Sequence, residues 1–193
     1  ACWRARAWRR RSITCTNSRE TPCTRRWSAT KEAAPAQRVI FCVYHETEER
    51  TLRAKVDEFE IATRRAGHEW ALFDLTDTFA DWLSSQRYAV SYFRQPRLLP
   101  TLLPKYLTFI ADRFQSFLIG EGIGPDHVVA LKGVGSLFGF LKVKDVVEKL
   151  APMVKGRLVV FFPGSYENNN YRLLDGYDGW NYLAVPITAD KEY

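Results

Sequence analysis

Beyond residue 37, short apolar runs alternate with longer stretches in which apolar and polar residues are interspersed. Four of these runs hold β-branched, aliphatic and aromatic residues at consecutive positions, which is typical of strands buried on both faces of a parallel sheet. The predicted strands are Val39–Tyr44, Trp70–Leu75, Val128–Leu131 and Leu158–Phe162. A short last strand is expected over Tyr182–Ile187.

Between the runs, apolar residues recur every three or four positions, and this spacing predicts helices with one buried face. Thr47 is expected to cap the first helix, and a second helix should precede an irregular segment over residues 87–96. A long third helix is expected from Leu98 to Phe117, with a potential kink at Pro104. The fourth helix should begin at Leu137, after Ser136 as its N-cap, and bury four residues: Phe140, Val143, Val147 and Leu150.

This alternation of strands and helices predicts an α/β fold of three layers, in which an open, mostly parallel sheet lies between helices on both faces. Val128–Leu131, the fourth helix and Leu158–Phe162 form a βαβ unit, whose strands should be parallel. Pro163 and Gly164 are expected to stop the second of these strands. The architecture is P-loop-like or Rossmann-like, but the Walker A pattern is missing. We expect residues 38–193 to form one domain.

The charge of the chain is unevenly distributed. The formal net charge is +6, yet residues 1–37 hold nine Lys and Arg against two Asp and Glu, a net of +7. Residues 38–193 carry a net charge of −1. The predicted domain therefore lacks the overall basic balance of a nucleic-acid-binding domain, and any contact with nucleic acid is expected to be indirect or through the basic tail.

The N-terminal tail, residues 1–37, has no apolar periodicity and permits three interpretations. An Arg-rich, acid-poor leader is typical of an organelle transit peptide. Arginines interleaved with Trp3, Trp8 and Trp27 would suit a nucleic-acid-binding arm. The abrupt change of composition near Arg38 favours a third interpretation, a misassigned gene start, so the tail is expected to be disordered or foreign to the domain.

Targeting and redox signals are weak. No apolar run reaches the roughly 18–20 residues that a membrane span needs, and no secretory signal is recognisable. The cytoplasm is therefore the expected compartment. Cys2, Cys15 and Cys23 lack the spacing of a zinc site, and Cys42 lies in an apolar run, where it is expected to be a small core residue.

Ligands of open α/β proteins bind outside the carboxyl ends of the strands. The third predicted strand is followed by a glycine-containing turn before a predicted helix, where backbone N–H groups could hold a phosphate, and the second strand ends in a carboxylate. The candidate nucleotide-binding residues are Lys132, Gly133, Gly135, Ser136 and Asp74. The glycines at 133, 135 and 139 miss the G-x-G-x-x-G spacing by one position, so ordinary turn glycines with Ser136 as a helix cap are the favoured explanation.

The remaining polar residues at strand ends do not complete a catalytic set. Asp74 could hold Mg²⁺ together with three acids at a helix start: Glu46, Glu48 and Glu49. Solvated acids favoured by the helix dipole explain the same pattern. Ser165 lacks the G-x-S-x-G context of a nucleophile. We therefore expect no catalytic residue, no metal and no cofactor.

Three segments, in this order, resemble a known family: LKGVGSLFGFL at 131–141, FFPGSY at 161–166 and NYLAVPI at 181–187. Through them the chain is similar to the BrxB family of BREX bacteriophage-defence systems, from about Arg38 to Ile187. The resemblance implies a small non-catalytic component of a bacterial multi-protein assembly. The other components that it implies as partners are a large ATPase, a phosphatase-like protein and a DNA methyltransferase.

Two function hypotheses follow. The resemblance implies an interaction or regulatory subunit, for which the expected contact residues are Gly164, Ser165, Tyr166, Arg172 and Trp180. The alternative is a nucleotide-binding enzyme that uses the Lys132–Ser136 turn for phosphate. Both hypotheses require the turns Lys132–Ser136 and Pro163–Tyr166 to lie at the same end of the sheet.

Overall fold

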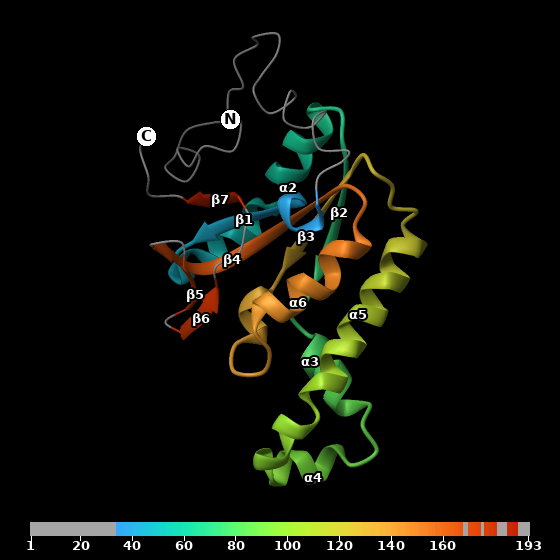
Figure 1. Cartoon of the computed structure of the whole chain (residues 1–193), viewed down its shortest axis with the longest axis vertical. Helices are drawn as coiled ribbons and strands as arrows, with labels where there is room; N and C mark the ends of the chain where they lie inside the picture. The colour runs from blue at the N-terminus through green and yellow to red at the C-terminus, as the bar shows by residue number, and fades with distance from the viewer. Residues whose placement is uncertain (1–33, 168–169, 175, 181–184, 189–193) are drawn as a thin grey trace.

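A parallel sheet lies at the centre of the protein (Figure 1). The computed structural model describes residues 34–167, 170–174, 176–180 and 185–188. Five strands follow one another in the order β2-β3-β4-β1-β7, and every neighbouring pair is parallel. These strands are β1 (Val39–Tyr44), β2 (Glu69–Asp74), β3 (His127–Lys132), β4 (Arg157–Glu167) and β7 (Val185–Thr188).

Helices cover both faces of this sheet. The α-helices are α2 (Glu49–Arg65), α3 (Thr78–Ser84), α4 (Ala89–Arg94), α5 (Leu103–Gly120) and α6 (Val143–Leu150). Short 3₁₀ turns join them: η2 (Pro35–Arg38), η3 (Glu46–Glu48), η4 (Pro96–Thr101), η5 (Val134–Leu137) and η6 (Ala151–Met153). The predicted three-layer, open α/β fold is confirmed.

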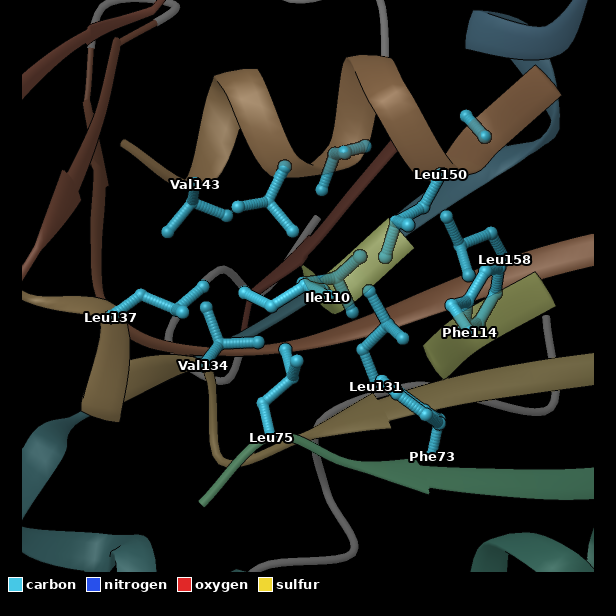
Figure 2. Close-up of a cluster of buried hydrophobic side chains, with 14 of the residues drawn as sticks. Phe73, Leu75, Ile110, Phe114, Leu131, Val134, Leu137, Val143, Leu150 and Leu158 are labelled. Carbon is cyan, nitrogen blue, oxygen red and sulfur yellow. The ribbon is translucent and has the colours of Figure 1, made fainter. Parts of the chain in front are cut away.

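The larger of two apolar clusters lies between the sheet and the helices α5 and α6 (Figure 2). Helix α6 contributes four residues that are at most 1% exposed: Val143, Val146, Val147 and Leu150. Helix α5 adds Tyr106, Ile110 and Phe114, which follow each other at four-residue intervals and are fully buried. Because these residues recur at helical spacing, they form one continuous stripe against the strands.

The smaller cluster lies on the opposite face, under α2. Leu52 and Val56 of α2 pack there with alternate residues of the strands, and the Phe59 ring meets Phe161 edge-on with centroids 5.0 Å apart. Strand β4 serves both clusters, because Val159 and Phe161 point to this side while its other apolar residues join the larger cluster. Alternating side chains on one buried strand therefore connect the two cores.

Strand β4 does not stop at Pro163 and Gly164, and this prediction was wrong. Its parallel partner β1 ends opposite Pro163, but β4 continues to Glu167 and pairs with an antiparallel hairpin, β5 (Asn170–Leu173) and β6 (Gly176–Trp180). Proline has no N–H to donate, yet it is tolerated where a strand changes partners. Gly164 has a φ of +154°, which only glycine adopts readily.

The fourth predicted helix starts six residues later than expected. Ser136 lies inside η5, and α6 begins only at Val143. Gly139 has a φ of +79°, a left-handed conformation that interrupts helical structure between the two elements. The prediction that Ser136 caps a helix is therefore wrong.

Two further differences concern the α-helical region before β3. Pro104 does not kink a helix but stands in the first turn of α5, where its missing N–H costs no hydrogen bond. Residues 89–94, predicted to be irregular, form α4. The last predicted strand is present as β7, shifted to Val185–Thr188, while residues 182–184 of the predicted strand lie outside the described part of the chain. Among the described residues, no helix has the length and apolar character to cross a bilayer.

Candidate functional site

The structure brings the two predicted turns to the same end of the sheet, as the sequence required. A Cβ atom added to Gly135 would lie 3.3 Å from Cγ of Pro163, so the Lys132–Ser136 turn touches the end of the parallel part of β4. A cavity of about 230 Å³ opens beside them. Its lining residues are Glu46, Glu49, Arg53, Gly133, Gly135, Ser136, Pro163 and Leu174. We call this region, together with Asp74 and Lys132, the rim.

The rim occupies the position at which an open α/β sheet usually binds ligands. The chain leaves β1 toward α2 on one face, whereas it leaves β3 toward α6 on the other face. Strand β4 lies between β1 and β3, so the two departing segments diverge and leave a crevice above it. Such a divergence is the topological switch point of the sheet.

Asp74 and Lys132 end the neighbouring strands β2 and β3 and form an ion pair, with Nζ and Oδ2 2.8 Å apart. The other carboxylate oxygen of Asp74 accepts hydrogen bonds from the backbone N–H and the hydroxyl of Thr76, at 2.9 and 2.6 Å. Partial burial raises the pKa of Asp74, but the hydrogen bonds from Lys132 and Thr76 outweigh it and hold the pKa below its usual value. Both charges proposed for phosphate and metal binding are thus engaged with each other.

Gly133 and Ser136 are also engaged within the chain. Gly133 has a φ of +77°, and a Cβ atom there would come within 2.4 Å of the Thr76 hydroxyl oxygen. The Ser136 hydroxyl donates to the carbonyl oxygens of Leu75 and Gly133, at 3.0 and 2.8 Å. Since η5 has only four residues, the turn also lacks the long helix whose N-terminus would attract an anion. Gly133 therefore leaves room for Thr76 of the same chain, as expected for an ordinary turn glycine.

On the α2 side of the rim, Glu49 bridges two residues. It accepts a short hydrogen bond from the Tyr44 hydroxyl and one from Nε of Arg53 at 2.7 Å. Burial, followed by the hydrogen bond to Glu49, raises the pKa of Tyr44. His45, rather than Thr47, caps η3, since its ring nitrogen Nδ1 accepts from the Thr47 N–H. Within the described ranges, no group of three or more His, Cys, Asp and Glu side chains is arranged to hold a metal ion.

Sequence reasoning missed Arg53 and Leu174 as rim residues. Glu49 and Arg53 are four positions apart on a helix, and this spacing was the available signal that they pair on the α2 side of the cavity. Nothing in the sequence pattern placed Leu174, because its position depends on the hairpin that follows β4. Cys42, expected in the core, packs partly buried against the smaller cluster, and burial raises the pKa of its thiol to about 12.

The predicted contact residues lie together in the second, antiparallel sheet. Gly164 stands opposite Leu173, Ser165 opposite Arg172, and Tyr166 opposite Tyr171. Tyr171 in turn stands opposite Trp180 of β6, whose side chain lies outside the described part of the structure. Arg172 is exposed, whereas Tyr171 is fully buried against the Phe41 and Tyr166 rings.

Fold and rim together define an open α/β protein with a small crevice at the switch point of its sheet. Residues 101–186 match the family model described as BREX protein BrxB. The match confirms the resemblance of this part of the chain to a BrxB-like family. It runs from η4 through α5, β3, α6, β4 and the hairpin into β7. The comparisons with curated proteins and with solved structures give no match.

Proposed function

We propose that this BrxB-like protein is a non-catalytic subunit of a BREX phage-defence system, where it assembles or regulates other components. The observation that supports the proposal best is that polar groups of the rim are bonded within the chain. The Asp74 carboxylate, the Lys132 ammonium group and the Ser136 hydroxyl each bond to groups of the same chain. A site that must bind and transform a substrate keeps such groups available, so the rim suits a structural role.

We place the partner contact on the antiparallel sheet formed by the end of β4 with β5 and β6. Arg172 offers an exposed cation beside Ser165, and arginine and aromatic residues dominate the binding energy of protein interfaces. The partners proposed from the family resemblance are the large ATPase, the phosphatase-like protein and the methyltransferase. Their meeting place would be the cytoplasm, with nucleic acid contacted only through such partners or through the basic tail.

Affinity purification of the tagged full chain from its native host tests this proposal. We expect one or more of the named partners to be retained at stoichiometric amounts. Arg172→Glu should reduce the retained amount several-fold, whereas Arg50→Glu, an exposed arginine on α2, should not. Recovery of none of the three partners by the unmodified chain would contradict the proposed function.

A nucleotide-binding enzyme is the second candidate, and the position of the cavity at the switch point favours it. The cavity of about 230 Å³ is smaller than the roughly 300–1,000 Å³ typical of small-molecule sites. Isothermal titration calorimetry with ATP, GTP and dinucleotides, each with Mg²⁺, separates the two candidates. We expect no heat of binding and no thermal shift, and a saturable signal that Asp74→Ala abolishes would establish the second candidate instead.

A further inference from the structure

A helical extension stands apart from the sheet and its rim. It consists of α4 and η4 and is defined here as the tip, residues 87–101. Figure 1 shows α4 at the far end of the long axis of the molecule, beyond α3 and the beginning of α5. The two elements of the tip contact each other, and η4 also contacts α5. The tip is thus an ordered part of the fold that extends away from the central layers.

The apolar residues of the tip divide into two faces. Tyr92 and Leu99 are partly buried and pack against the larger core cluster, which anchors the tip. Four others point outward: Tyr88, Val90, Phe93 and Leu98, with 57%, 64%, 66% and 40% of their surfaces exposed. Seven large apolar residues are exposed in the described part of the chain, so more than half of them lie within eleven consecutive positions. Isolated exposed apolar residues are ordinary, but such a concentration marks an interaction site.

The tip is also uniformly positive. No Asp or Glu occurs between Asp81 and Asp112, while four basic residues do: Arg87, Arg94, Arg97 and Lys105. Asp81, at the start of this interval, is already paired with Arg113, with Oδ2 and Nη1 2.6 Å apart. The outward apolar residues thus lie in a stretch of chain whose charges are all positive, and the Arg87 guanidinium lies 5.3 Å from the centre of the Tyr88 ring, although residues 38–193 as a whole are nearly neutral.

We infer that the tip is a docking surface for a protein partner whose contact face is acidic around an apolar centre. The positive charges of the tip favour a partner that carries negative charges, because complementary charges steer association and select the partner. Tyr88, Phe93 and the arginines are of the types that anchor protein interfaces.

Two other anionic partners fit the tip less well. Val90 and Leu98 are aliphatic and have no ring on which a nucleic-acid base could stack. Helix α4 spans six residues, much shorter than the amphipathic helices that lie in membrane surfaces, and the prolines at 96 and 100 prevent its extension as a regular helix. A protein surface accommodates all four exposed apolar side chains.

Site-specific photo-crosslinking of the full chain in its native host tests the inference. A photoreactive phenylalanine derivative replaces Phe93, and the same derivative at Ile61, an exposed position on α2, serves as the control. We expect a crosslink to one protein from position 93 and none from position 61. The crosslinked peptide of the partner should be rich in Asp and Glu. The double change Arg94→Glu and Arg97→Glu should reduce the yield about tenfold or more, because it replaces attraction by repulsion.

Several outcomes would overturn the inference. These are equal crosslinking at the two positions, no effect of the double charge reversal, and a crosslink from position 93 to nucleic acid or lipid. A matching thermal melt of the double variant and the unmodified chain excludes unfolding as the cause of a lost crosslink. If native purification still recovers a BREX component in any of these cases, the proposed function stands without the tip. If the crosslink forms but no BREX component is recovered, the inference stands and the proposed function fails.

Discussion

The rim and the tip differ in where their chemically capable groups find partners. At the rim, the charges, hydroxyl groups and glycines are engaged by neighbouring parts of the same chain, as in the Asp74–Lys132 pair. At the tip, arginines and apolar side chains such as Phe93 point away from the fold. The rim lies where open α/β sheets usually bind ligands, but its polar groups are bonded to other residues of the same chain. The tip has no such position in the fold, but its side chains are exposed. Position in a fold is thus a weaker guide to binding than the state of the groups found there.

The largest effect should come from Gly164, which directly follows the rim residue Pro163 in β4. Gly164→Ala places a Cβ atom 1.9 Å from the carbonyl oxygen of Arg172, which belongs to the paired strand β5 and cannot swing aside. We expect a loss of about 3 kcal/mol or more in the free energy of unfolding. Urea denaturation followed by circular dichroism measures this loss.

Gly120→Ala is the matched control for this change. Gly120 is the last residue of α5, and no atom lies within 4 Å of an added Cβ. Alanine should there be neutral or stabilising by up to about 1 kcal/mol. An equal loss in the two variants would show that the close approach of β4 and β5 does not constrain the strand next to the rim.

A smaller effect is expected from the rim ion pair. Asp74→Asn removes the charge opposite Lys132 but keeps an oxygen that can accept from Thr76. The loss should be about 1 kcal/mol at neutral pH, since 44% of the Asp74 side chain is exposed to solvent. Urea denaturation at several pH values measures it, with Asp57→Asn on the exposed side of α2 as the control.

The sign of the pH dependence follows from the lowered pKa of Asp74 in the folded protein. Its contribution is fully present above the unfolded pKa of about 4 and disappears as the pH falls through the lower folded value. The variant and the unmodified chain should therefore converge in stability below pH 4. A difference that persists unchanged in acid would mean that the ion pair does not stabilise the fold.

The smallest effect on stability is expected at the tip. Phe93→Ser should change the free energy of unfolding by less than about 0.5 kcal/mol, because the ring is 66% exposed and contributes little to the core. Tyr92→Ser, one position earlier and packed against the larger cluster, should cost about 1–2 kcal/mol. Thermal denaturation of the two variants compares them. If Phe93→Ser proves as damaging as Tyr92→Ser, the outward face of the tip supports the fold and is not a free surface.

The sequence was sufficient for the central sheet because buried strands leave a local signal. Consecutive apolar residues marked β1 to β4, and the helix between β3 and β4 implied that these two are parallel neighbours, as the structure confirms. The proximity of the turns at Lys132 and Pro163 followed from the same rule. That the rim residues bind a ligand or a partner stays a prediction, as does the division of the chain at residue 37.

What the sequence could not provide depends on contacts distant along the chain. Proline and glycine at 163 and 164 carry the local signal of a strand end, but β4 continues because Arg172 and Leu173 offer it a new antiparallel partner. The delayed start of α6 depends on the left-handed conformation of Gly139, and the sequence does not show which glycine adopts a positive φ. The ion pair between Asp74 and Lys132 was not predicted, because it depends on β2 and β3 being neighbours in the sheet.

The double membership of β4 has a mechanical consequence. One continuous strand forms the middle of the parallel sheet and, seven residues after its start, pairs with the antiparallel hairpin. No linker separates the two, so a partner that pulls on the hairpin pulls directly on the strand to which both hydrophobic layers are attached. A force or rotation applied at the hairpin would reach the hydrophobic core through β4, because no hinge lies between them.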